Sequence, residues 1–98
     1  MIKRVILKIY GRVQMVMYRD STQRKASKLG LVGWVRNEDD GSVKVVAEGK
    51  EKDLEKLIDW CYNGPMLAKV DKIGIDWQKA TPKKTGQAGQ FNKFEIKY

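Results

Sequence analysis

The chain has 98 residues, of which 33% are charged and 42% are hydrophobic, and its formal net charge at pH 7 is +8. This composition excludes intrinsic disorder, and the length predicts a single domain over residues 1–98. The sequence contains no histidine, which removes the commonest general base and the commonest metal ligand, so we expect neither a metal site nor a cofactor.

The N-terminal third predicts a strand, a loop and a helix. Apolar residues alternate over 3–13, which is typical of a strand. A loop over 14–19 then leads into a helix over 20–29, because Tyr18 and the apolar residues after it recur at helical spacing. Gly30 suits the residue that follows the end of a helix.

The middle third predicts a hairpin and a second helix. Strands over 31–37 and 42–48 flank an Asp- and Gly-rich turn at 38–41, so they pair as an antiparallel hairpin. Apolar residues at i, i+3, i+4 and i+7 then define a helix over 51–62, and one of them is Cys61, the single cysteine of the chain, which we interpret as a core residue. Asn-Gly-Pro at 63–65 ends this helix.

The last third predicts strands on either side of a long loop. A fourth strand covers 70–77, a mobile loop rich in Gly, Lys and Thr covers 79–90, and a closing strand covers 91–98. The order is βαββαβ with either a short extra strand or a long return. It predicts an α+β, ferredoxin-like two-layer sandwich, in which two helices cover one face of an antiparallel sheet.

Two polar residues at the ends of predicted elements, Arg19 and Asn37, could form a phosphate-binding site. The loop between the first strand and the first helix ends on Arg19, and Asn37 ends the second strand. Backbone N–H groups in such a loop, the positive end of the following helix and a guanidinium can together bind a phosphate dianion. An amide such as Asn37 can orient a water but cannot act as a base at neutral pH, so the chemistry must depend on positioning and charge stabilisation.

These residues also carry a resemblance. GRVQ, Val16 and Tyr-Arg at 18–19, then GWVRN at 33–37 and DGSV at 40–43, resemble the acylphosphatase family in order along nearly the whole chain. The resemblance implies hydrolysis of small acyl phosphates to a carboxylate and inorganic phosphate by direct attack of water, without a metal or a covalent intermediate. It implies that a phosphate oxygen of the substrate accepts the water's proton.

The same resemblance implies roles for individual residues. Arg19 resembles the phosphate-binding arginine of the family, and Asn37 resembles the asparagine that orients the attacking water. The backbone of Met15, Val16, Met17 and Tyr18 resembles the phosphate-binding loop. Gln14 and Thr22 resemble supporting residues beside it.

Met15 departs from the family pattern, which has glycine at this position. Glycine in such a loop usually indicates a positive φ or close backbone approach to the ligand. If φ is positive here, methionine costs roughly 1–2 kcal/mol; if φ is negative and the side chain points outward, methionine is accommodated. Reduced activity, near-normal activity and an inactive anion-binding protein all remain open.

The expected partners are an acyl phosphate or inorganic phosphate, and the expected setting is a cytoplasmic monomer without membrane contact. We also considered a nucleic-acid-binding domain, because RNA-recognition motifs share this strand order and the chain is basic. The predicted strand over 42–48 lacks the aromatic residue that those motifs use, so no nucleic-acid partner is expected.

Overall fold

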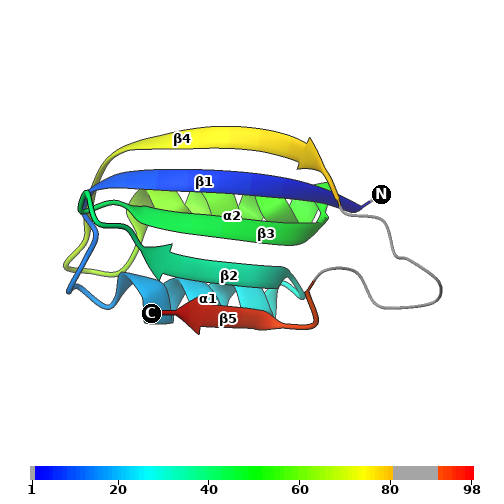
Figure 1. Cartoon of the computed structure of the whole chain (residues 1–98), viewed down its shortest axis with the longest axis horizontal. Coiled ribbons are helices and arrows are strands. Elements are labelled where there is room, and N and C mark those ends of the chain that lie inside the picture. Colours follow the sequence, from blue (N-terminus) through cyan, green and yellow to red (C-terminus); the bar gives the residue numbers. More distant parts are fainter. Residues whose placement is uncertain (1, 81–90) are drawn as a thin grey trace.

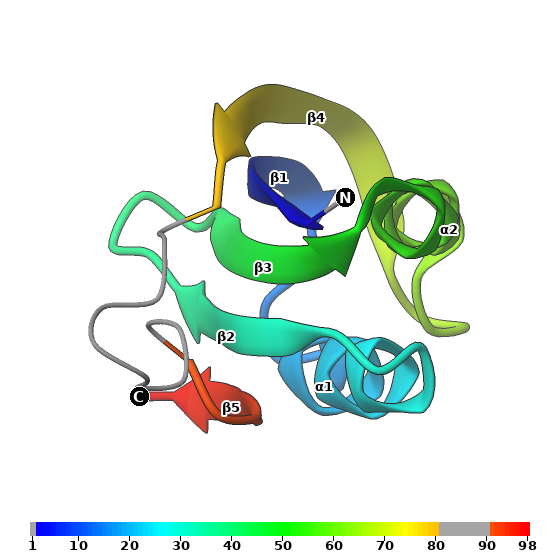
Figure 2. The same ribbon diagram turned by 90° about the vertical axis from the view of Figure 1, so that its right-hand side faces the viewer.

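The computed structural model describes residues 2–80 and 91–98 and forms two layers, a sheet and a pair of helices (Figure 1). The elements in chain order are β1 (Ile2–Arg12), α1 (Tyr18–Lys28), β2 (Val32–Asn37), β3 (Val43–Lys50), α2 (Glu51–Asn63), β4 (Lys69–Lys79) and β5 (Phe94–Lys97). The strands lie in the order β4-β1-β3-β2-β5, and both helices lie on the same face of this sheet (Figure 2). The predicted fold class is therefore confirmed.

The sheet is mixed, so one detail of the prediction was wrong. β1 pairs antiparallel with β3 and β4, and β2 pairs antiparallel with β3, but β5 runs parallel to β2. The parallel pairing follows from the strand directions. β4 and β3 run opposite to β1, and β2 runs opposite to β3. β5 returns in the direction opposite to β4, which is the direction of β2, so β5 and β2 are parallel.

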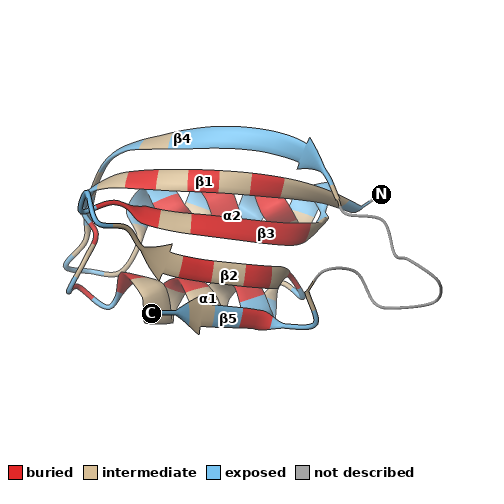
Figure 3. Cartoon of the chain, viewed as in Figure 1, coloured by how far each residue is buried: buried red, intermediate tan, exposed pale blue. Residues whose placement is uncertain are grey.

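The core lies between the sheet and the helices. Val5, Leu7 and Ile9 of β1 are fully buried, and buried and less buried positions alternate along this strand (Figure 3). The predicted stripe of α2 is buried, including Cys61, as are Tyr18, Thr22 and Ala26 of α1. This packing fixes both helices against the sheet and so fixes the ends of β1 and β2 relative to α1.

Several boundaries differ from the prediction. α1 begins at Tyr18 rather than at residue 20, because the buried Tyr18 ring anchors the first turn. The closing strand is confined to Phe94–Lys97 instead of 91–98. Lys79 belongs to β4, and residues 81–90 of the predicted mobile loop lie outside the described residues. Within the described residues, neither helix has the length and apolar character needed to cross a membrane.

Candidate active site

The predicted site residues gather at one end of the sheet. The loop after β1, the start of α1, the end of β2 and the C-terminal end of β5 all lie at the left of Figure 1. They enclose a cleft of about 430 Å³. Its lining includes Val13, Met15, Met17, Arg19, Asn37 and Tyr98. The structure therefore brings the predicted arginine and the predicted amide to the same cleft from two different elements.

The loop of residues 14–17 contains two residues in the left-handed conformation that anion-binding nests use. Met15 and Met17 have positive φ, at 62° and 66°, whereas Gln14 and Val16 do not. In a nest, a left-handed residue beside a right-handed one turns successive N–H groups toward one side of the chain. Among the described residues, the N–H groups of 14–17 have no hydrogen-bond acceptor. These donors are therefore available to an anion in the cleft.

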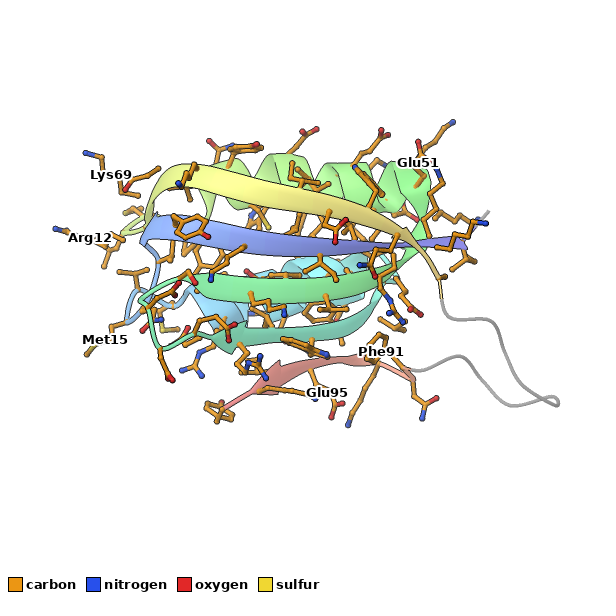
Figure 4. All side chains as sticks on the ribbon, turned by 45° about the horizontal axis from the view of Figure 1, so that its top comes forward. Arg12, Met15, Glu51, Lys69, Phe91 and Glu95 are labelled. Atoms are coloured by element: carbon orange, nitrogen blue, oxygen red, sulfur yellow. The ribbon has the colours of Figure 1, made fainter. Side chains whose placement is uncertain are left out.

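Met15 combines the two alternatives that its sequence position left open. Its φ is positive, so the backbone is strained for a methionine. Its side chain is fully exposed, at 100%, and points away from the sheet (Figure 4). Methionine thus occupies the conformation that glycine favours, and no side-chain clash forces the loop into another shape.

The N-terminus of α1 adds donors to the same cleft. The N-cap residue is Met17, which makes no side-chain hydrogen bond to the helix, and the first helical bond runs from the Ser21 N–H to the Met17 carbonyl. The N–H groups of the first turn are therefore not capped. Asp20 in that turn also lines the cleft, but its carboxylate pairs with Arg24, which offsets its charge.

Arg19 is the second residue of α1 rather than the last residue of the loop. One guanidinium N–H donates to the Lys97 carbonyl over 3.3 Å, and the guanidinium carbon lies 4.7 Å from the centre of the Tyr98 ring. The other guanidinium donors form no hydrogen bond with the described residues. The end of the chain therefore holds the arginine in place while most of its donors remain free for phosphate oxygens.

Asn37 is the last residue of β2 and pairs with Val43 of β3. Its side-chain oxygen, Oδ1, is buried and has no hydrogen-bond partner among the described residues. A buried acceptor without a donor is uncommon in folded proteins, so an incoming hydrogen-bond donor would satisfy this oxygen. A water molecule in the cleft fits this requirement.

Gln14 ties the loop to the β2–β3 hairpin. Its side-chain amide donates to the carbonyl of Glu38 over 2.8 Å and to the carbonyl of Ser42 over 2.9 Å. These carbonyls flank the turn that follows Asn37. A single side chain therefore links the predicted phosphate-binding loop to the hairpin that follows the predicted water-orienting residue.

The hairpin turn is itself held by Asp40. Its carboxylate accepts from the Ser42 hydroxyl over 2.5 Å and the Ser42 N–H over 3.0 Å, and it pairs with Lys8 of β1 over 2.9 Å. The Ser42 hydroxyl and the Lys8 ammonium together hold the pKa of Asp40 well below its usual range, and the bond to Asp40 raises the pKa of Lys8.

Tyr18 and Thr22, the latter predicted to be a supporting residue, are buried in the core beside the cleft. The Tyr18 hydroxyl donates to the Cys61 carbonyl over 2.6 Å and joins the start of α1 to α2. Burial raises the pKa of Tyr18 far above its usual range and that of the Cys61 thiol to about 12, so both stay protonated at neutral pH. Thr22 is fully buried, and its hydroxyl has no partner among the described residues.

Sequence reasoning missed the contribution of β5. Ile96 and Tyr98 line the cleft, and Lys97 accepts the Arg19 hydrogen bond. No motif marks these residues, because their place depends on the parallel pairing of β5 with β2. A metal centre is not indicated in the described part of the chain, where no group of three His, Cys, Asp or Glu residues lies close enough to hold an ion.

Comparison with known proteins gives consistent matches over nearly the whole chain. The acylphosphatase family model matches residues 5–96. The acylphosphatase of Methylococcus capsulatus is 45% identical over 94 residues, covering 96% of this chain and 95% of that protein. The crystal structure of acylphosphatase from Bacillus subtilis has a TM-score of 0.84 at 33% identity and covers 100% of both chains. A crystal structure of full-length HypF in the phosphate- and nucleotide-bound form has a TM-score of 0.84 at 26% identity, covering 100% of this chain and 12% of that one.

Proposed function

The chain belongs to the acylphosphatase family, and on that premise we propose that it hydrolyses acyl phosphates with Arg19 binding the phosphate and Asn37 orienting the attacking water. The observation that carries this assignment is the pairing, in one cleft, of a guanidinium with free donors and a buried amide oxygen without a partner. The first group suits a phosphate dianion, and the second suits a water.

The proposed reaction needs no basic side chain. The water attacks phosphorus, the bond from phosphorus to the acyl oxygen breaks, and the carboxylate leaves with the bonding electrons. Because a carboxylate is a good leaving group, charge stabilisation and positioning supply the catalysis. Arg19, the N–H groups of residues 14–17 and the first turn of α1 provide that charge, and a substrate phosphate oxygen accepts the water's proton. We propose that this chemistry proceeds without a metal or a cofactor.

Arginine and asparagine variants test the assignment, with benzoyl phosphate as substrate. Arg19→Ala and Asn37→Ala should each lower kcat by about 10²–10³ or more, because each removes a preorganised group at the reacting phosphate. Arg12→Ala is the matched control: it removes the same charge from the exposed end of β1, outside the cleft lining. Wild-type rates in both site variants, or an equal loss in the control, would overturn the assignment.

We extend the proposal to the setting of the enzyme. A single buried cysteine suits a reducing compartment, so we propose that the chain acts in the cytoplasm. We further propose one domain over residues 1–98 that acts as a monomer on small acyl phosphates. Sedimentation at the concentrations used for kinetics tests the monomer, since activity that rises with association would contradict it.

The strained Met15 favours one alternative, a member of the family that binds anions but turns them over slowly. Its positive φ raises the cost of holding the loop in its binding shape. Inorganic phosphate should then raise the midpoint of thermal unfolding, while benzoyl phosphate is hydrolysed no faster than in buffer. Hydrolysis that disappears in Arg19→Ala would exclude this alternative.

A further inference from the structure

The face of the sheet opposite the helices carries a row of like charges. Along β1 the buried residues point toward the helices, so the residues between them point to the other, open face (Figure 2). On this face Lys8, Lys44, Arg36 and Lys97 lie directly opposite one another on β1, β3, β2 and β5. We name these four residues the cation row. Neighbouring strands are about 4.8 Å apart, so the row spans roughly 14 Å.

This arrangement is unfavourable for the isolated chain. Like charges that are directly opposite on neighbouring strands destabilise a sheet. Acidic partners offset two of the four charges, since Lys8 pairs with Asp40 over 2.9 Å and Arg36 pairs with Glu38 over 2.9 Å. The other two members form no ion pair with a described residue. Two positive charges of the cation row therefore remain available to pair with an external polyanion.

Two aromatic rings flank the cation row. Trp34 is half-buried on β2, with the guanidinium carbon of Arg36 at 4.8 Å from its ring centre. Tyr10 is half-buried on β1, with the ammonium of Lys72 at 4.8 Å from its ring centre. Contacts of this kind are weak at exposed sites, about 0.5–1 kcal/mol, so an incoming planar group can replace the cations over the rings.

We propose that this open face, the cation row with Trp34 and Tyr10, binds single-stranded nucleic acid. Phosphates would follow the row of charges, and bases would stack on the two rings, which is the general mode of sequence-tolerant single-strand binding. A lipid surface is a poorer match, because the aliphatic neighbours Ile6 and Val46 do not project as exposed side chains.

This proposal revises the sequence-based expectation that no nucleic acid binds. That expectation rested on the absence of an aromatic residue from the strand now assigned as β3. The structure instead supplies rings from the strands on either side, Tyr10 on β1 and Trp34 on β2. Two acids, Asp76 and Glu95, lie on the edge strands in the adjacent row, which also holds Trp34. The phosphates should therefore follow the cation row, and only a base should reach the Trp34 ring.

Binding of a fluorescein-labelled oligouridylate of about 12 nucleotides tests the electrostatic half of the proposal. Lys44→Ala/Lys72→Ala removes one lysine of the cation row and the lysine that lies beside it over Tyr10. Binding should weaken, and the slope of log K against log salt should become shallower by about 1.4, because two cations next to the path of the phosphates are lost. Lys52→Ala/Lys56→Ala is the matched control, since it removes two exposed lysines from α2, which packs on the opposite face. No binding by the wild type at low salt, or an equal loss in the control, would overturn the proposal.

Tryptophan emission tests the stacking half. The oligouridylate should quench wild-type emission and should not quench Trp34→Leu, whereas inorganic polyphosphate, which has no bases, should bind more weakly and leave the emission unchanged. Quenching by polyphosphate, or displacement of the oligouridylate by anionic phospholipid vesicles at equal charge, would identify a general polyanion surface instead. Because Lys44→Ala/Lys72→Ala leaves the cleft intact, its benzoyl phosphate hydrolysis should stay at the wild-type rate, so the two proposals can fail separately.

Discussion

Helix α2 and the loop of residues 14–17 differ in whether the observed structure agrees with local backbone preference. In α2 the apolar stripe is buried, acids occupy the first turn, and the helix ends before Gly64 at a positive φ, so local preference and packing agree. In the loop, two methionines have positive φ, and the N–H groups lack partners among the described residues. The chain therefore gains stability in the helix–sheet core and concentrates local strain where an anion is proposed to bind.

Truncation of a buried side chain in α2 should give the largest change in stability. Leu57 is fully buried between the helix and the sheet, so Leu57→Ala should lower the free energy of unfolding by about 2–5 kcal/mol through lost burial and a cavity. The folded fraction should keep a near-normal kcat, because Leu57 does not line the cleft. Urea denaturation and kinetics on the same sample measure both quantities.

The control for this change is Lys56→Ala on the exposed side of the same helix. It should alter the free energy of unfolding by less than about 0.5 kcal/mol. If the folded fraction of Leu57→Ala also lost most of its kcat, the core would not be separate from the reactive loop, and the division between them would be wrong.

The same contrast explains which features the sequence could predict. The elements of the core followed from apolar periodicity, because helix and strand spacing leave a direct trace in the sequence. The parallel pairing of β5, and with it the contacts of Lys97 and Tyr98 to Arg19, left no such trace, since it depends on which sheet edge is free. The gathering of Arg19 and Asn37 in one cleft was expected from the family resemblance, and their roles in catalysis stay predictions.

Loss of the Gln14 side chain should affect the loop more than the core. Gln14→Ala removes two hydrogen bonds to the hairpin, which lowers the free energy of unfolding by roughly 1–3 kcal/mol. Because the loop then loses its link to the hairpin that follows Asn37, kcat for benzoyl phosphate should fall by at least about ten-fold. Gln14→Glu should be at least as harmful, since a carboxylate faces the two carbonyls.

Gln78→Ala is the control for the Gln14 variants. Its amide bonds only to the nearby Asp76 on the exposed β4 strand, among the described residues. We expect neither stability nor kcat to change measurably. A Gln14→Ala enzyme with wild-type kcat would mean that the loop keeps its place without the hairpin.

Replacement of Met15 by glycine should relieve strain with little change in rate. The positive φ costs methionine roughly 1–2 kcal/mol, and the greater freedom of glycine in the unfolded chain offsets part of the gain. Met15→Gly should therefore raise the free energy of unfolding by roughly 0.5–1 kcal/mol. Since the backbone already has the conformation that glycine favours, kcat should change by less than about ten-fold.

Met66→Gly is the matched control, because Met66 is also exposed in a loop, at 97%, but has no positive φ. It should lower stability slightly. A gain in kcat of about 10²-fold or more in Met15→Gly would show that methionine misdirects an N–H donor, and the loop would then be compromised rather than merely strained.

The smallest effect should come from Asp40, which holds the hairpin to which Gln14 bonds. Its pKa lies below its ordinary value of 3.8, so its charged form stabilises the fold above that pH, and this contribution is lost as the pH falls below it. Asp40→Asn should be slightly less stable than the wild type at neutral pH, and the difference should shrink as the pH falls below 3.8. Asp39→Asn, at an exposed neighbour that forms no ion pair with the described residues, is the control and should match the wild-type stability at neutral pH. Benzoyl phosphate hydrolysis should fall less than in Gln14→Ala, because the strand pairing of Asn37 with Val43 still holds the base of the hairpin. A stability difference that grows on acidification would show that Asp40 does not anchor the turn through its charge.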